Sequence, residues 1–66
     1  MNPQKIAIKE LRENGYRLDR EGANHMVFVH EALHARITIS RSSHFDDGDL
    51  QMIRSEIKRN QRKGLQ

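Results

Sequence analysis

The spacing of apolar residues changes along the chain, and the first spacing predicts a helix. Near the start, apolar residues recur at three and four positions, which is the period of one helix face: Ala7, Ile8 and Leu11. Asn2 followed by Pro3 favours a helix start, because Asn caps the free amides and Pro fits the first turn. Gly15 suits the left-handed residue that follows a helix end. We therefore predict a helix over residues 3–14.

Alternation of apolar and polar residues then replaces the helical spacing and predicts strands. The expected strands cover residues 16–19, 25–30 and 35–40, separated by a break at 20–24 and a short connection at 31–34. In the middle strand we place Met26 and Phe28 toward the core, because alternate side chains of a strand point to opposite faces. His25, Val27 and Val29 would then lie on the other face of the sheet.

Helical spacing returns after a polar loop at residues 41–48. Asp49 can cap a last helix in which Leu50, Ile53 and Ile57 form the inward stripe. The predicted fold class is α+β, in the order helix, three-stranded antiparallel sheet, helix. The short connections place both helices on one face of the sheet. One domain covers residues 1–66, and the basic tail at about 60–66 is expected to be weakly ordered.

Composition adds limits on size, compartment and stabilisation. A chain of 66 residues is too short for a large enzyme with an enclosed pocket. No apolar run approaches the length that spans a bilayer, and no secretory signal is seen, so we expect a soluble protein without a membrane anchor. The absence of Cys excludes disulfides and thiolate metal sites and suits the cytoplasm.

The charge favours an acidic partner. Lys and Arg number 12 against nine Asp and Glu, for a net charge of +3. The last thirteen residues hold one acidic residue, Glu56, against five cations: Arg54, Lys58, Arg59, Arg62 and Lys63. Such a run is also common as a solvated helix end, since cations are favourable near helix C-termini. Charge alone therefore identifies no substrate.

Histidines are the side chains best suited to acid and base chemistry at neutral pH. His30 and His34 are four residues apart, but this spacing converges on a metal only on a helix, and here it crosses a hairpin. We expect no metal and no cofactor. A Ser-His-Asp hydrolase is also disfavoured, because Ser42, Ser43 and His44 share one loop in a chain too small for a substrate pocket.

The order of motifs resembles the HicA toxin family. Asn14-Gly15-Tyr16 ends the first helix, and Gly22-Ala23-Asn24-His25 opens a strand, where the family has Asn-Gly-aromatic and Gly-Ser-Asn-His or Gly-Ser-His-His. The resemblance spans about residues 5–58. It implies a fold similar to double-stranded RNA-binding domains, an mRNA interferase activity, and a HicB antitoxin as partner. It also implies that His25 is the catalytic residue.

Two segments depart from the family pattern. Ala23 stands in place of the usual Ser, and Ser40-Arg41-Ser42 stands where Pro-Arg-His is usual, so only Arg41 matches there. His44 is displaced by two positions from the family His. His44 is therefore left out of the predicted site.

Other residues complete the predicted site. We take Arg41, Arg36 and Lys9 as candidate RNA contacts, because guanidinium and ammonium groups bind phosphates. Gly22 and Asn24 are expected to position His25, with Gly22 supplying a backbone conformation that other residues avoid. The alternative function is a non-catalytic module that binds double-stranded RNA by shape. A second copy of the chain is a further candidate partner.

Overall fold

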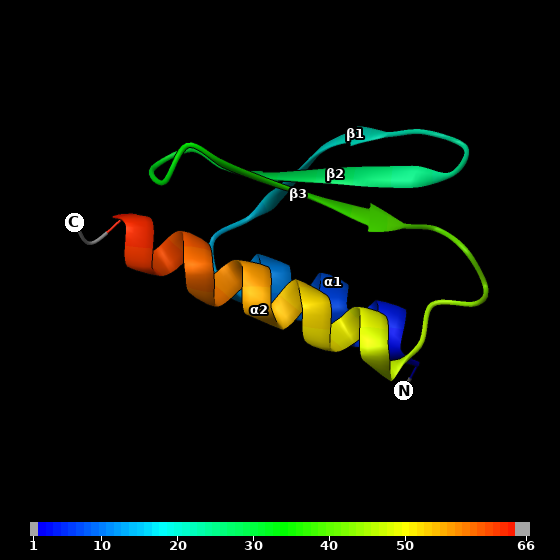
Figure 1. Cartoon of the computed structure of the whole chain (residues 1–66). Coiled ribbons are helices and arrows are strands. Elements are labelled where there is room, and N and C mark those ends of the chain that lie inside the picture. Colours follow the sequence, from blue (N-terminus) through cyan, green and yellow to red (C-terminus); the bar gives the residue numbers. More distant parts are fainter. Residues whose placement is uncertain (1, 65–66) are drawn as a thin grey trace.

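The computed structural model describes residues 2–64. Its elements are α1 (Pro3–Glu13), β1 (Arg17–Glu21), β2 (His25–His30), β3 (Ala35–Ser40) and α2 (Asp47–Gly64). The strands form one antiparallel sheet in the order β1-β2-β3. Both helices lie side by side against the same face of this sheet, and the other face carries no helix (Figure 1). The predicted α-β-β-β-α order is confirmed.

Helix α1 begins after the Asn2 cap and ends before Gly15, the start and end signals seen in the sequence. The Asn2 side chain accepts a hydrogen bond from the Lys5 amide at 2.8 Å, with Pro3 in the first turn. Gly15 has a φ of 90°, in the left-handed region that favours glycine. The helix ends at Glu13, and Ala7 and Leu11 are buried against the sheet.

The core lies between the helices and the covered face of the sheet. Met26 and Phe28 are buried, as predicted, and Phe28 is paired with Ile37 of β3. The core cluster takes residues from every element but β1, together with Tyr16 just before that strand: Ala7, Leu11, Tyr16, Met26, Phe28, Ile37, Ile39, Leu50, Ile53 and Ile57. The alternation of β2 therefore leaves Val27 and Val29 on the uncovered face, where both are half-buried.

Strand β1 differs from its prediction at both ends. It begins at Arg17 and continues to Glu21, through residues that we expected to break the sheet. The register shifts between Leu18 and Arg20, so that Leu18 pairs with Phe28 and Arg20 with Val27. One extra residue, Asp19, thus interrupts the pairing, and this irregularity explains why the apolar and polar alternation stops while the strand does not.

Helix α2 is longer than predicted at both ends. Asp46, not Asp49, caps its first turn, because the Asp46 carboxylate accepts from the Asp49 amide at 3.0 Å. The Asp49 carboxylate in turn accepts from the Asp46 amide at 3.1 Å. At the other end the helix runs to Gly64, so residues 60–64 of the expected weakly ordered tail are helical. Residues 65–66 of that tail lie outside the described residues.

Candidate functional site

His25 is the first residue of β2, at one end of the sheet. It lies opposite Ser40, the last residue of β3, and its side chain is exposed. Because Met26 and Phe28 point into the core, the alternation places His25 on the uncovered face with Val27 and Val29. The imidazole is therefore open to a ligand that approaches the sheet from the side away from the helices.

The backbone of the turn before His25 is held by Arg41. The Gly22 amide donates to the His25 carbonyl at 2.8 Å, which closes the β1–β2 turn. The Arg41 amide donates to the Asn24 carbonyl at 3.0 Å, and the Arg41 guanidinium donates to the Gly22 carbonyl at 2.8 Å. Arg41 thus ties both sides of the turn to the end of β3 and holds the backbone from which the His25 side chain projects.

The expected role of Gly22 is only partly correct. Gly22 does lie in the turn that positions His25, but its φ is outside the positive region, and a Cβ there would meet only the His25 carbonyl oxygen at 3.6 Å. The prediction of a backbone conformation that other residues avoid is therefore wrong for Gly22. Asn24 contributes through its carbonyl oxygen, while its side chain is exposed.

The predicted RNA contacts lie in three different places. Arg41 is beside the His25 turn, but its guanidinium also pairs with the Glu21 carboxylate at 3.2 Å. Arg36 lies opposite Val29 on the uncovered face, four residues along β3 from Ser40, which is about 13 Å. Lys9 is exposed on α1, two residues from both Ala7 and Leu11, and so faces away from the core. The structure places Arg41, but not Lys9, next to His25.

Gln4 also contacts this end of the sheet, although it was not among the predicted site residues. Its side-chain amide donates to the Ser40 carbonyl at 2.6 Å and fixes the start of α1 to the residue paired with His25. Gln4 and Ser40 are 36 positions apart in sequence. No local pattern signals such a contact, because it follows from the packing of α1 across β3.

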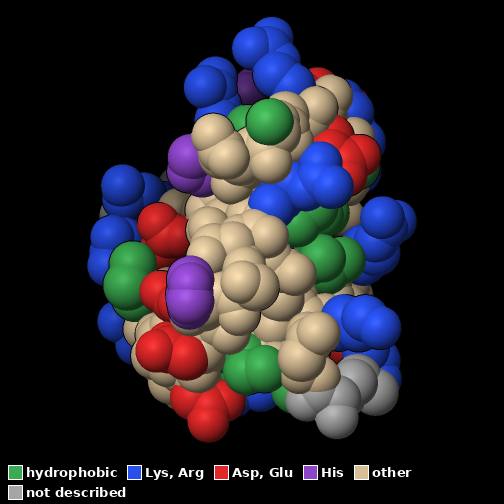
Figure 2. Space-filling view, turned by 90° about the vertical axis from the view of Figure 1, so that its right-hand side faces the viewer, with side chains coloured by type: hydrophobic (Ala, Val, Ile, Leu, Met, Phe, Trp, Pro, Cys, Tyr) green, Lys and Arg blue, Asp and Glu red, His purple; other side chains and the backbone are tan. Residues whose placement is uncertain are grey.

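Charge is unevenly distributed over the end of the molecule that carries the β1–β2 turn. Figure 2 views this end, and the acidic side chains gather mainly in its lower left part, while Lys and Arg side chains lie above and to the sides. Three aspartates open α2 on this side: Asp46, Asp47 and Asp49. The start of α2 is therefore locally acidic.

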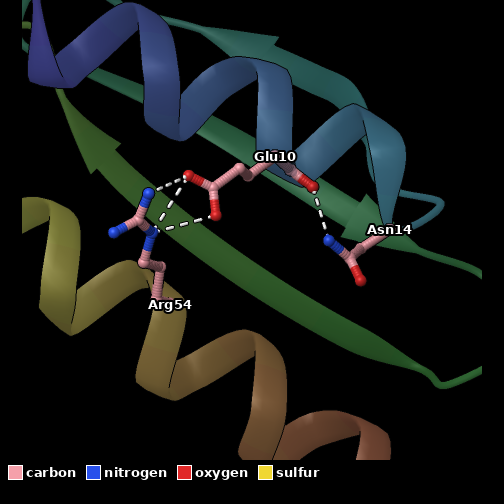
Figure 3. Close-up of polar contacts among 3 residues, drawn as sticks. All are labelled: Glu10, Asn14 and Arg54. Carbon is pink, nitrogen blue, oxygen red and sulfur yellow. Dashed lines mark hydrogen bonds and ion pairs between the residues drawn. The ribbon is translucent and has the colours of Figure 1, made fainter.

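A separate polar contact joins the two helices on the covered side of the sheet. The Glu10 carboxylate of α1 accepts three hydrogen bonds, of 2.7 to 3.0 Å, from the Arg54 guanidinium of α2 (Figure 3). These hydrogen bonds lower the pKa of Glu10, against an opposing effect of partial burial. The Glu10–Arg54 bridge lies in the helix layer, away from His25, so we assign it to stability.

The other histidines differ from His25 in their surroundings. His30 is half-buried, lies edge-on to Tyr16 at 5.2 Å, and accepts from the Leu33 amide through Nδ1. His34 occupies the β2–β3 turn with a φ of 52°. His44 is exposed in the segment before α2, and its amide donates to the Ser42 hydroxyl. These contacts give His30 a structural role at the opposite end of the sheet.

Within residues 2–64, no three His, Asp or Glu side chains lie close enough together to hold a metal ion. No helix in the same range has the length and apolar character needed to cross a membrane. Comparison of the chain with protein-family models, with curated proteins and with solved structures finds no significant match. The likeness to HicA toxins and to double-stranded RNA-binding domains therefore stays a prediction from the sequence.

Proposed function

We propose that this protein is a HicA-like toxin that cleaves mRNA without a metal ion, with His25 as the general acid or base. The observation that carries the proposal is the position of His25. It is an exposed imidazole on the uncovered sheet face, at a turn whose backbone is fixed by Arg41. A solvent-accessible imidazole that projects from a fixed backbone can reach an RNA strand for proton transfer.

The proposed reaction is an internal transfer at one phosphodiester. A base removes the proton of the 2′-hydroxyl, the 2′-oxygen forms a bond to phosphorus, and the bond from phosphorus to the 5′-oxygen breaks as that oxygen receives a proton. The products are a 2′,3′-cyclic phosphate and a 5′-hydroxyl. His25 performs one of the two proton transfers, and the Arg41 guanidinium beside the turn stabilises the charge that builds on the phosphate.

The uncovered face of the sheet also supports the proposed partner. Val27 and Val29 are half-buried at its centre, with Arg20 and Arg36 exposed on the flanking strands. Apolar side chains that stay partly exposed on the same face as His25 favour a protein contact there. We propose that a HicB-like antitoxin covers this face and blocks access to His25. A second copy of the chain is the alternative occupant.

One observation favours binding without cleavage. Arg41 is hydrogen-bonded to the Gly22 carbonyl and paired with Glu21, so its charge is partly used within the protein. A cation held in this way gives less stabilisation to a reacting phosphate than a free one. In this second candidate function, the same fold recognises double-stranded RNA by shape and leaves it intact.

The test is incubation of the purified protein with labelled single-stranded RNA in EDTA, followed by a denaturing gel. We expect His25→Ala to reduce cleavage at least about 100-fold, because general acid–base groups contribute at least that much. The circular dichroism spectrum should not change, since the side chain is exposed. In cells, His25→Ala should also abolish growth inhibition.

His34→Asn is the matched control. It removes an exposed histidine at the opposite end of the sheet, and Asn tolerates the left-handed backbone of that position. We expect it to cleave like the wild type. Equal cleavage by His25→Ala and the wild type would contradict the catalytic assignment. RNA binding without cleavage by the wild type would favour the second candidate function.

A further inference from the structure

Four cations form a ridge on the outer side of α2. Lys58, Arg59, Arg62 and Lys63, named here the α2 ridge, are all exposed and line a shallow groove of about 360 Å³ together with Ser55. Their spacing of one, three and four residues keeps them on one helix face. The opposite face carries Ile53 and Ile57, which are buried in the core. The ridge therefore points away from the body of the protein.

The ridge cations are not used within the described part of the chain. The ion pairs of residues 2–64 engage Arg17, Arg41 and Arg54, and none engages a ridge residue. No acidic side chain lines the groove. Favourable interaction with the helix dipole accounts for cations in the last turn, but the effect falls off within that turn. It does not account for Lys58 and Arg59.

The residues that line the groove favour a nucleic acid over a membrane or a protein as the anionic partner. Amphipathic helices that bind membranes place Trp, Phe or Leu beside their cations, and protein interfaces centre on apolar or aromatic anchors. The groove of the α2 ridge has one serine and four cations and no apolar side chain. A surface of this kind suits the phosphates of a nucleic acid, which bind mainly through charge.

We propose that the α2 ridge binds the sugar-phosphate backbone of RNA outside the segment that is cleaved at His25. This inference rests on the proposed function for its choice of RNA. The start of α2 lies at the same end of the molecule as the turn before His25 (Figure 1). Lys58 lies 11 residues, or about 17 Å, further along the helix. The ridge and His25 also lie in different layers, so a short RNA at His25 does not reach the ridge. The ridge therefore strengthens binding of long RNA and takes no part in the chemistry.

The test compares two variants with the same loss of charge, both made in the His25→Ala protein so that RNA stays intact. Arg59→Gln/Arg62→Gln removes two ridge cations. Lys5→Gln/Arg12→Gln removes two exposed cations of α1 that are also outside the ion pairs of the described residues. Binding of a long fluorescent single-stranded RNA is followed by anisotropy over a series of salt concentrations.

We expect the ridge variant to bind about tenfold more weakly at low salt and to lose about 1.4 from the slope of log K against log salt, the value for two phosphate contacts on a single strand. The α1 variant should keep most of the affinity at low salt and most of the salt slope. Equal losses in the two variants, or no loss in either, would overturn the proposal. Ridge-dependent binding to anionic lipid vesicles, with RNA binding unaffected, would overturn it in favour of a membrane surface.

A cleavage assay separates this inference from the proposed function. With His25 restored, the ridge variant should raise KM for a long RNA with little change in kcat, because binding energy far from the reacting phosphate acts on both states alike. A fall in kcat with unchanged KM would contradict a docking role. If the wild type cleaves no RNA, the proposed function fails, while ridge-dependent binding to the His25→Ala protein would still hold.

Discussion

Gly15 and Gly22 both lie in turns, but the two positions differ in whether a larger residue would fit. Gly15 has a φ of 90°, and a Cβ there would lie 2.7 Å from Nε2 of His30. The His30 ring cannot move freely, because it contacts Tyr16 and accepts from the Leu33 amide. Gly22 has neither constraint: its φ is ordinary and its nearest contact would be at 3.6 Å.

We therefore predict opposite outcomes for two alanine substitutions. Gly15→Ala should lower the free energy of unfolding by about 2 kcal/mol, from left-handed strain and overlap with His30. Gly22→Ala should stay within about 0.5 kcal/mol of the wild type. Thermal unfolding followed by circular dichroism measures both. A loss of stability in Gly22→Ala as large as that in Gly15→Ala would contradict the backbone assignment of the two turns.

Among the elements, the start of α2 depends on a reciprocal pair of side chains. The Asp46 carboxylate accepts from the Asp49 amide, and the Asp49 carboxylate accepts from the Asp46 amide. Asp46→Ala should cost about 1 kcal/mol in unfolding free energy, since it leaves first-turn amides without this acceptor. Asp46→Ser should restore most of the loss, because Ser is also a good cap.

Asp47→Ala is the control for charge alone. It removes an acidic residue of the same turn, but no side-chain hydrogen bond of Asp47 is present among residues 2–64. We expect a smaller loss than for Asp46→Ala. Chemical denaturation gives all three free energies. If Asp47→Ala destabilises the protein as much as Asp46→Ala, negative charge rather than the cap would govern the start of α2.

The fold was predictable wherever the signal is local. The Asn2 cap, the helical spacing of α1 and the alternation of β2 and β3 each depend on neighbours within four residues, and each is found in the structure. The start of α2 was placed wrongly because the segment holds three aspartates that can all cap. The irregularity at Asp19 was missed because pairing with β2, and not the composition of β1, decides it.

The candidate site was predictable only in part. The alternation of β2 places His25 on the uncovered face, and this much follows from Met26 and Phe28 being apolar. The contacts that hold this end of the sheet could not be predicted, because they join residues far apart in the sequence. Arg41 and Gly22 are 19 positions apart, and Gln4 and Ser40 are 36 positions apart. Lys9 and Arg41 were both predicted as RNA contacts because both are cations. In the fold they lie apart, since Lys9 is on α1 and Arg41 follows β3.

At the scale of the whole molecule, contacts between distant parts of the chain join the helices to each other and to the turn before β1. Asn60 of α2 donates to the Tyr16 hydroxyl at 3.0 Å, and Gln61 donates to the Asn14 side chain at 2.8 Å. The Glu10–Arg54 bridge lies about two turns earlier along α2. The last turns of α2 thus fix the end of α1, which explains why the helix continues beyond residue 60.

The Glu10–Arg54 bridge makes stability depend on pH in a defined direction. Hydrogen bonds from Arg54 lower the pKa of Glu10 in the folded protein relative to the unfolded chain. The stabilising effect is therefore complete above the ordinary glutamate pKa, about 4.3, and is lost as the pH falls through the lower folded value. Glu10→Gln should lower the melting temperature at pH 7 by about 2 to 5 °C, as for a partly exposed ion pair. The difference from the wild type should narrow steadily below pH 4.

Glu13→Gln is the control, because Glu13 is exposed on the same helix and forms no ion pair within residues 2–64. Melting temperatures of the three proteins from pH 7 down to pH 2 test the prediction, since titration of all other groups is common to them. Glu13→Gln should stay close to the wild type throughout. A difference for Glu10→Gln that is the same at every pH would show that the lost contact is one of shape and not of charge. The charged bridge would then not be what holds α1 to α2.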